Sequence, residues 1–114
     1  MRESGFRADQ RIDAPAEQAR FVRTKWNLGL AGGVLLSTPV PAADALLRSL
    51  VDGWIDEALA DAKRQSVSGK AVTPFLLSRI EQLSSGRSLA ANIALVKHNA
   101  EVGARLALAL EDLR

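Results

Sequence analysis

The chain has 114 residues, of which 47% are hydrophobic and 25% are charged, and its formal net charge is +2. This length and composition predict one small folded domain, and the charges are too evenly mixed for a nucleic-acid-binding surface. The absence of cysteine excludes disulfides and thiolate metal sites.

The sequence shows no sign of membrane insertion or export. The longest apolar stretch, residues 28–36, is far shorter than the roughly 20 residues that cross a bilayer. The amino terminus, "MRESGFRADQR", lacks the apolar core of a secretory signal. We therefore expect a cytoplasmic protein with no membrane partner and no nucleic-acid partner.

The first part of the chain predicts an extended segment followed by a helix. Residues 2–13 have no helical period and are expected to be extended or to form a short strand. Asp13 as an N-cap and Pro15 in the first turn predict a helix that Gly29 ends. The apolar residues of this helix repeat at helical spacing: Ala19, Val22 and Trp26.

A short apolar run, "GGVLLSTPV" at residues 32–40, follows this helix. It is too short for a buried helix and is bounded by glycines and Pro39, so it predicts a strand. A strand this apolar is expected inside a sheet that is covered on both faces. No other segment of the chain supplies its neighbours, so the sequence indicates that part of the sheet is missing.

Three further helices are predicted. Residues 46–62 have the pattern of a surface helix with one apolar face, formed by Leu47, Leu50, Val51, Trp54, Ala58 and Leu59. Thr73 and Pro74 begin the next helix, which runs through Leu83 with Gly86 as its stop. Ser88 is the expected cap of a last helix that extends to Leu113.

The last helix places two amides on its apolar side. Asn92 and Asn99 are seven residues apart and share a stripe with leucine and valine residues. One interpretation is that each amide is buried and bonded to a neighbouring group. The other is that this stripe faces a wet cleft, in which a ligand supplies the partner.

Two cations precede predicted helix starts, where backbone N–H groups attract anions. Lys70 comes before the helix start at Thr73, and Arg87 comes before the last helix. The alternative is a surface cation beside an ordinary capped helix. The sequence contains no nucleophile motif, no phosphate loop and only one histidine, His98, so it indicates neither a catalytic residue nor a metal ligand.

The stretches "KWNLGLAGGVLLSTPVP" and "GKAVTPFLLSRIEQLSSGRSLAANIALVKHNA" carry a family resemblance. They resemble the carboxy-terminal third of the pseudouridine-5′-phosphate glycosidases, which are also called indigoidine synthase A-like proteins. The resemblance spans nearly the whole chain. Residues 1–114 are therefore expected to be the carboxy-terminal segment of such a domain.

The resemblance implies an α/β protein with a three-layer α/β/α fold. This chain would supply its mostly helical end, with about four helices and one or two short strands. It also implies a trimer that reversibly cleaves the carbon–carbon glycosidic bond of pseudouridine 5′-phosphate to uracil and ribose 5-phosphate. In the family a lysine forms a Schiff base with the opened sugar, a glutamate acts as general acid and an aspartate helps to hold manganese. These residues lie upstream in the family, so the segment alone is expected to carry no catalytic residue and no metal.

The resemblance also suggests residues that contact substrate. Asn92 matches an asparagine of the family's "NI" motif, which implies a hydrogen bond to the sugar or the base. Lys70 and Thr73 match the family pattern, and the helix start at Thr73 is the argument for expecting both to bind substrate. His98 and Thr38 stand where relatives commonly have asparagine, which is a departure from the pattern.

Three hypotheses follow for the function. The first is the carboxy-terminal part of such a glycosidase, inactive by itself. The second is a self-standing helical interaction or assembly module without catalysis. The third is a small sugar-phosphate binding domain that uses Lys70, Arg87 and Asn92.

Overall fold

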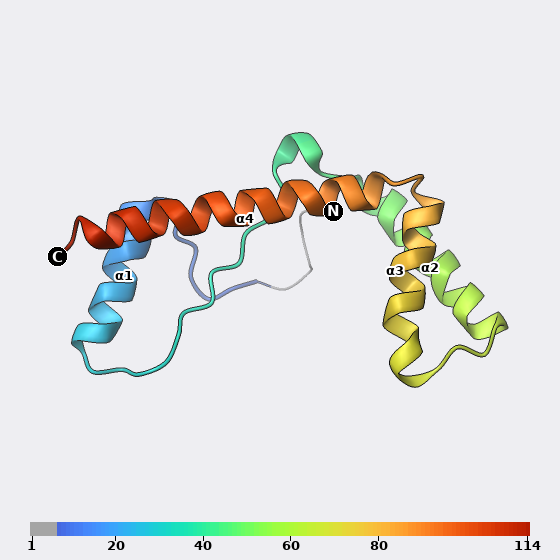
Figure 1. Ribbon diagram of the computed structural model, residues 1–114, viewed down its shortest axis with the longest axis horizontal. Helices are drawn as coiled ribbons and strands as arrows, with labels where there is room; N and C mark the ends of the chain where they lie inside the picture. The colour runs from blue at the N-terminus through green and yellow to red at the C-terminus, as the bar shows by residue number, and fades with distance from the viewer. Residues whose placement is uncertain (1–6) are drawn as a thin grey trace. The chain divides into compact units, whose positions relative to one another are not determined.

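The computed structural model describes residues 7–114 and is mostly helical (Figure 1). The α-helices are α1 (Pro15–Asn27), α2 (Arg48–Arg64), α3 (Val72–Leu83) and α4 (Arg87–Glu111). Two 3-10 turns, Ala42–Asp44 and Gly69–Ala71, precede α2 and α3. The expectation of about four helices is therefore confirmed.

Within residues 7–114 the structure contains no strand, although the sequence predicted one or two. Residues 32–40 and residues 7–13 have no regular secondary structure and belong to no sheet. The rest of the extended prediction, residues 2–6, lies outside the described residues. The physical reason is that a strand needs a hydrogen-bonded neighbour, and residues 7–114 supply none.

The chain divides into two compact units. Among the described residues, unit 1 comprises 39–95, and unit 2 comprises 7–38 together with 96–114. The division falls within α4, so the first part of this helix belongs to unit 1 and the remainder to unit 2.

Unit 1 is built on a hairpin of α2 and α3, which pack against each other (Figure 1). Trp54, Ala58 and Ala62 are buried because their spacing of four residues places them on one stripe of α2. Leu47 and Leu59, which the sequence placed on the same face, are 74% and 47% exposed. The helix begins and ends two residues later than predicted, at Arg48 and Arg64.

Two serines in the left-handed conformation end α2 and α3. Ser66 has φ 55° and Ser85 has φ 51°. After each serine the next amide reaches back to the last turn, so that Val67 N donates to Ala62 O at 2.9 Å and Gly86 N to Glu81 O at 3.0 Å. These bonds satisfy carbonyl groups that would otherwise lack a partner. The end of α3 at Leu83 is as predicted, although Ser85 precedes Gly86 as the first left-handed residue.

The start of α4 is held by Ser84 and not by the predicted cap. Ser84 is fully buried, and its Oγ accepts a hydrogen bond from the Ser88 amide at 3.1 Å. Ser88 itself lies inside the helix, which begins at Arg87 and ends at Glu111. The Arg87 guanidinium lies over the Trp54 ring at 5.0 Å from its centroid, which joins α4 to α2.

In unit 2, α1 begins without a side-chain cap. The predicted cap, Asp13, instead accepts a hydrogen bond from Arg11 Nε at 3.0 Å, and Ala14 occupies the N-cap position. Pro15 starts the helix as predicted, because the first turn needs no proline N–H. At the other end Gly29, with φ 73°, confirms the predicted stop.

The buried side of α1 faces the interior of unit 2. Gln18, Ala19 and Val22 are buried, whereas Trp26 is 47% exposed. Arg23 Nη2 donates to Leu110 O at 3.1 Å and so links α1 to the last turns of α4. Within residues 7–114, no helix has both the length and the apolar character that a membrane crossing needs.

Replacing a left-handed serine by glycine should stabilise the hairpin. Left-handed backbone costs a non-glycine residue about 1 to 2 kcal/mol, and the extra entropy that glycine loses offsets part of this. We expect Ser66→Gly to raise the free energy of unfolding by about 0.5 to 1 kcal/mol in urea denaturation. The matched control is Ser78→Gly inside α3, which should lower it by about 0.5 kcal/mol. A loss of stability in both variants would contradict the role given to Ser66.

Candidate functional site

Asn92 lies on an exposed face of α4. Its amide is exposed and has no hydrogen-bond partner among the described residues, while its neighbours Leu89 and Ile93 are each 47% exposed. The interpretation of Asn92 as a buried, satisfied amide is therefore wrong for this chain. The amide offers one acceptor and two donor hydrogens to a group from outside these residues.

Lys70 and Thr73 are also exposed, but they lie elsewhere. Lys70 is in the 3-10 turn Gly69–Ala71, and Thr73 is in the first turn of α3. The 12 residues of α3 then extend over about 18 Å before the chain turns into α4 and reaches Asn92. The three residues thus do not form one cluster in this chain, and their role in binding substrate stays a prediction.

Arg87, the other cation expected near an anion, already has partners. Its guanidinium stacks on Trp54, and Arg87 Nε donates to Ser84 O at 3.3 Å. Both contacts fasten the start of α4. The third hypothesis, which joined Lys70, Arg87 and Asn92 in one binding site, therefore finds no support in the geometry.

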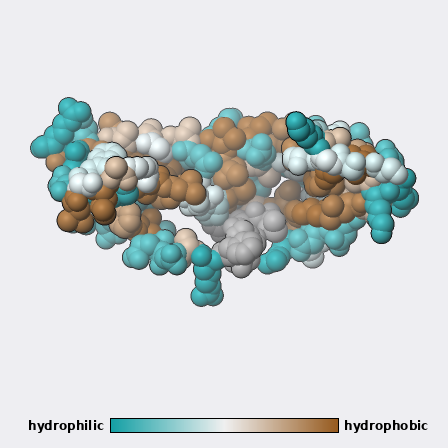
Figure 2. All heavy atoms as spheres, turned by 90° about the horizontal axis from the view of Figure 1, so that it is seen from below, coloured by the Kyte–Doolittle hydropathy of each residue, from teal (hydrophilic) through white to brown (hydrophobic). Residues whose placement is uncertain are grey.

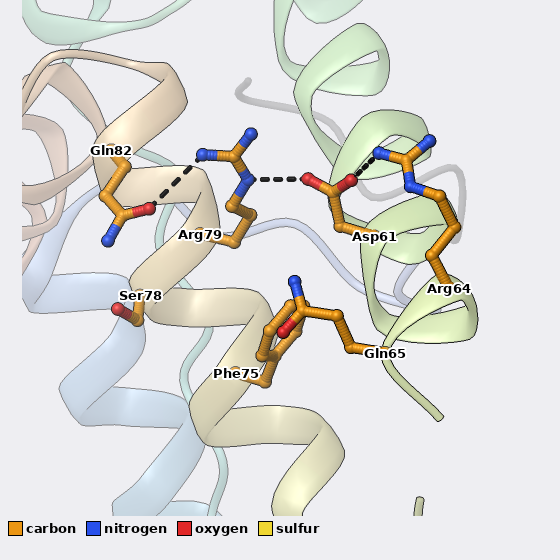
Figure 3. Close-up of a pocket in the computed structure, with 7 residues that line it drawn as sticks. All are labelled: Asp61, Arg64, Gln65, Phe75, Ser78, Arg79 and Gln82. Carbon is orange, nitrogen blue, oxygen red and sulfur yellow. Dashed lines mark hydrogen bonds and ion pairs between the residues drawn. The ribbon is translucent and has the colours of Figure 1, made fainter. Parts of the chain in front are cut away.

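A pocket between α2 and α3 was not anticipated from the sequence (Figure 3). It is open, has a volume of about 510 Å³, and is lined by Asp61, Arg64, Gln65, Phe75, Ser78, Arg79 and Gln82. Its walls are mostly polar.

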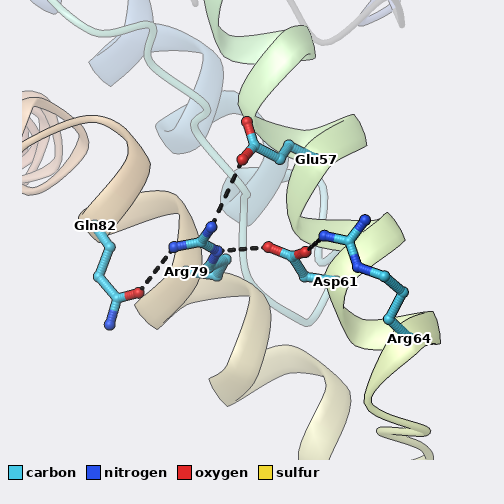
Figure 4. A network of polar contacts seen from close by, with 5 residues as sticks. All are labelled: Glu57, Asp61, Arg64, Arg79 and Gln82. Atoms are coloured by element: carbon cyan, nitrogen blue, oxygen red, sulfur yellow. Dashed lines mark hydrogen bonds and ion pairs between the residues drawn. The ribbon is translucent and has the colours of Figure 1, made fainter.

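Asp61 is the centre of a polar network (Figure 4). Its side chain is only 7% exposed, and its two oxygens accept hydrogen bonds from different arginines, Arg79 Nε at 2.6 Å and the Arg64 guanidinium. Arg79 also donates to Gln82 Oε1 at 3.2 Å and lies 3.6 Å from Glu57. All of these charges have partners, so the network serves to join α2 to α3 and leaves no free group for chemistry.

A sequence signal for Asp61 did exist. Asp61 follows Trp54 and Ala58 at intervals of seven and three residues, so it falls on the buried stripe of α2. A carboxylate on such a stripe needs a cation from the facing helix, and Arg79 supplies it.

Unit 2 contains a second open pocket of about 570 Å³. It is mostly apolar and is lined by Phe21, Thr24, Lys25, Leu28, Leu30, Gly33 and Val34. Lys25 Nζ donates to the carbonyl oxygens of residues 30, 31 and 32, at 3.0 Å each. The ammonium group is thus used to hold the loop after α1.

The described residues provide no cluster of side chains that could bind the manganese ion implied by the family resemblance. Within residues 7–114, no group of three or more His, Cys, Asp or Glu side chains is placed to hold a metal ion.

Comparison with known proteins identifies relatives along almost the whole chain. The family model described as "Indigoidine synthase A like protein" matches residues 1–109. A pseudouridine-5′-phosphate glycosidase from Cupriavidus pinatubonensis is 71% identical over 109 residues, which are 96% of this chain and 35% of that protein. One from Caldanaerobacter subterraneus subsp. tengcongensis is 48% identical over 112 residues, 98% of this chain and 36% of that protein.

A solved structure has the same fold over the shared part. The crystal structure of the prealnumycin C-glycosynthase AlnA in complex with ribulose 5-phosphate superposes with a TM-score of 0.82 at 30% sequence identity. The match covers 93% of this chain and 36% of that chain. The chain therefore spans about a third of the length of the relatives it matches. The family expected from the sequence motifs is confirmed.

Removing the Asp61 carboxylate should weaken the hairpin. Asp61→Ala leaves the half-buried Arg79 without its closest partner, so the free energy of unfolding should fall by about 1 to 2 kcal/mol in urea denaturation. Asp52→Ala is the matched control, because Asp52 forms an exposed pair with Arg48 at 3.5 Å and should change stability by less than about 0.5 kcal/mol. Equal effects of the two substitutions would contradict the central role of Asp61.

Proposed function

Because this chain belongs to the indigoidine synthase A-like family, we propose that it is the carboxy-terminal part of a pseudouridine-5′-phosphate glycosidase. The complete enzyme would reversibly cleave the carbon–carbon bond between uracil and ribose 5-phosphate. The observation that carries the proposal is the 71% identity to the Cupriavidus pinatubonensis glycosidase over 96% of this chain. The sugar phosphate named in the AlnA complex is in keeping with a substrate of this class.

The contribution of this chain is one wall of the substrate cleft. Asn92 stands exposed on α4 with both ends of its amide unused by the described residues, as a group that bonds to sugar or base requires. The apolar neighbours Leu89 and Ile93 would exclude water around that hydrogen bond. Lys70 and Thr73 keep their proposed role as further contacts, with Lys70 directed to the phosphate.

The reactive groups belong to the part of the family's sequence that this chain does not span. The Schiff-base lysine, the acid glutamate and the aspartate that holds manganese would all come from there. A Schiff base suits the reaction because its cation accepts the electrons of a carbon–carbon bond that has no good leaving atom. The enzyme would be a cytoplasmic trimer.

The balance of buried and exposed side chains favours this proposal over a self-standing helical module. Among the described residues the buried hydrophobic set contains only Ala19, Val22, Trp54, Ala58 and Ala62, and three of these are alanine. Large apolar side chains reach the surface in several places (Figure 2). A module that folds and stays separate by itself would bury such groups.

The proposal predicts that activity requires the rest of the family's sequence. In a fusion protein, this chain replaces the 109 matched residues of the Cupriavidus pinatubonensis glycosidase. We expect the fusion protein to release uracil from pseudouridine 5′-phosphate, and the 114-residue chain alone to release none. Uracil release by the chain alone would contradict the absence of catalytic groups. An inactive, folded fusion protein would contradict the proposed function.

Asn92→Ala in this fusion protein should lower kcat/KM by about 10- to 100-fold, because a hydrogen bond to substrate is lost. Asn27→Ala is the matched control, since Asn27 is an exposed amide at the end of α1 and should leave kcat/KM unchanged. Steady-state uracil release measures both. Equal kinetics in the two variants would remove Asn92 from the site.

Lys70→Ala in the fusion protein should raise KM by about 10-fold and change kcat little, because a charged contact to the phosphate contributes mainly to binding. Lys63→Ala, at the exposed last turn of α2, is the control and should leave KM unchanged. The proposed role of Lys70 would be wrong if both variants kept the original KM.

A further inference from the structure

Thr38 and Asn99 form a hydrogen bond within unit 2, although they are 61 positions apart in the sequence. Thr38 is half-buried in the segment before α2, and Asn99 is exposed on α4. Thr38 Oγ1 donates to Asn99 Oδ1. A hydroxyl that donates to an amide oxygen holds the amide in one orientation, with its NH2 group on the other side.

The NH2 group of Asn99 is unused. Among the described residues, neither of its two N–H donors has a partner. On α4 the amide lies between Val96, which is one turn earlier and 59% exposed, and Gly103, which is one turn later. A Cβ atom at Gly103 would meet no described residue outside its own helix within 4 Å. Two oriented donors thus stand beside an apolar side chain and open space.

These features define the chemistry of the group that would bind here. It must offer a hydrogen-bond acceptor, because the amide oxygen already accepts from Thr38 and the unused groups of Asn99 are donors. Phosphate fits poorly, since it favours cations, and no Lys or Arg of residues 7–114 is bonded to Thr38 or Asn99. A flat ring with carbonyl oxygens fits better, because its oxygens accept the N–H groups and its faces suit apolar side chains.

We propose that Asn99 binds a carbonyl oxygen of the uracil base, and that Thr38 is the positioning residue that orients the Asn99 amide. The inference rests on the proposed function, which supplies uracil as the base that is released or attached. An amide that is already held in place loses less conformational entropy on binding than a free one. The hydroxyl of Thr38 therefore increases the affinity for the base without contacting it.

The reaction in the direction of synthesis separates the two halves of the substrate. In the fusion protein, Asn99→Asp keeps the acceptor for Thr38 and removes both N–H donors. We expect the KM for uracil to rise about 10-fold and the KM for ribose 5-phosphate to change less than about twofold. Asn27→Asp, at the exposed end of α1, is the matched control and should leave both constants unchanged. An unchanged KM for uracil in Asn99→Asp would overturn the proposal.

Two substitutions at position 38 test the positioning role. Thr38→Val keeps the shape of the side chain but lacks the hydroxyl, and should raise the KM for uracil about 3-fold. Thr38→Ser keeps the hydroxyl and should retain the original KM. In the Asn99→Asp background, Thr38→Val should add little, because the donors that it orients are gone. Additive effects in the double variant, or equal losses in Thr38→Ser and Thr38→Val, would contradict the positioning role.

Calorimetric titration with uracil does not depend on turnover and so separates this inference from the proposed function. An inactive fusion protein that binds uracil about 10-fold more tightly than its Asn99→Asp variant would support the contact and contradict the glycosidase. Uracil release together with equal uracil affinities in the two proteins would support the glycosidase and overturn the contact. A fusion protein that neither releases nor binds uracil would overturn both.

Discussion

The buried carboxylate of Asp61 is the interaction on which unit 1 depends. With only 7% of its side chain exposed, it needs cations, and Arg79 of α3 and Arg64 of α2 provide them. The Arg79 contact fixes α3 against α2, and the Arg64 contact lies within α2. The turn that follows α3 contains the buried Ser84, which bonds to the first turn of α4. The first turn of α4, the helix that carries Asn92, is thus attached to a hairpin whose two helices are joined by an ion pair.

Unit 2 has the opposite character, because its most apolar segment has no partner within the described residues. Lys25 and Thr38 hold the two ends of residues 33–37, yet the backbone between them donates and accepts nothing. The backbone groups of such a segment are satisfied by water while it is exposed and would need protein partners if it were buried. Several leucines of this unit are exposed, in a chain that spans about a third of the relatives it matches.

Asn92 illustrates how a polar residue on an apolar stripe is interpreted. The stripe pattern alone allowed a buried amide as well as a ligand contact. Exposure without a protein partner removes the first option in this chain, and the ligand contact stays a proposal. Lys70 and Thr73 have less structural support as substrate contacts than Asn92, because about 18 Å of α3 separates them from it.

The sequence by itself determined the four helices, the end of α1 at Gly29 and the family. Helical periodicity, a helix-ending glycine and motif spacing are all local properties of the chain. It misplaced the caps at Asp13 and Ser88, since Arg11 binds the Asp13 carboxylate and Ser84 Oγ accepts a hydrogen bond from the Ser88 amide. The partner of Asp61, the exposure of Asn92 and the isolation of residues 33–37 were decided only by tertiary structure. Each depends on which groups far along the chain lie within hydrogen-bonding or packing distance, and no local pattern specifies that.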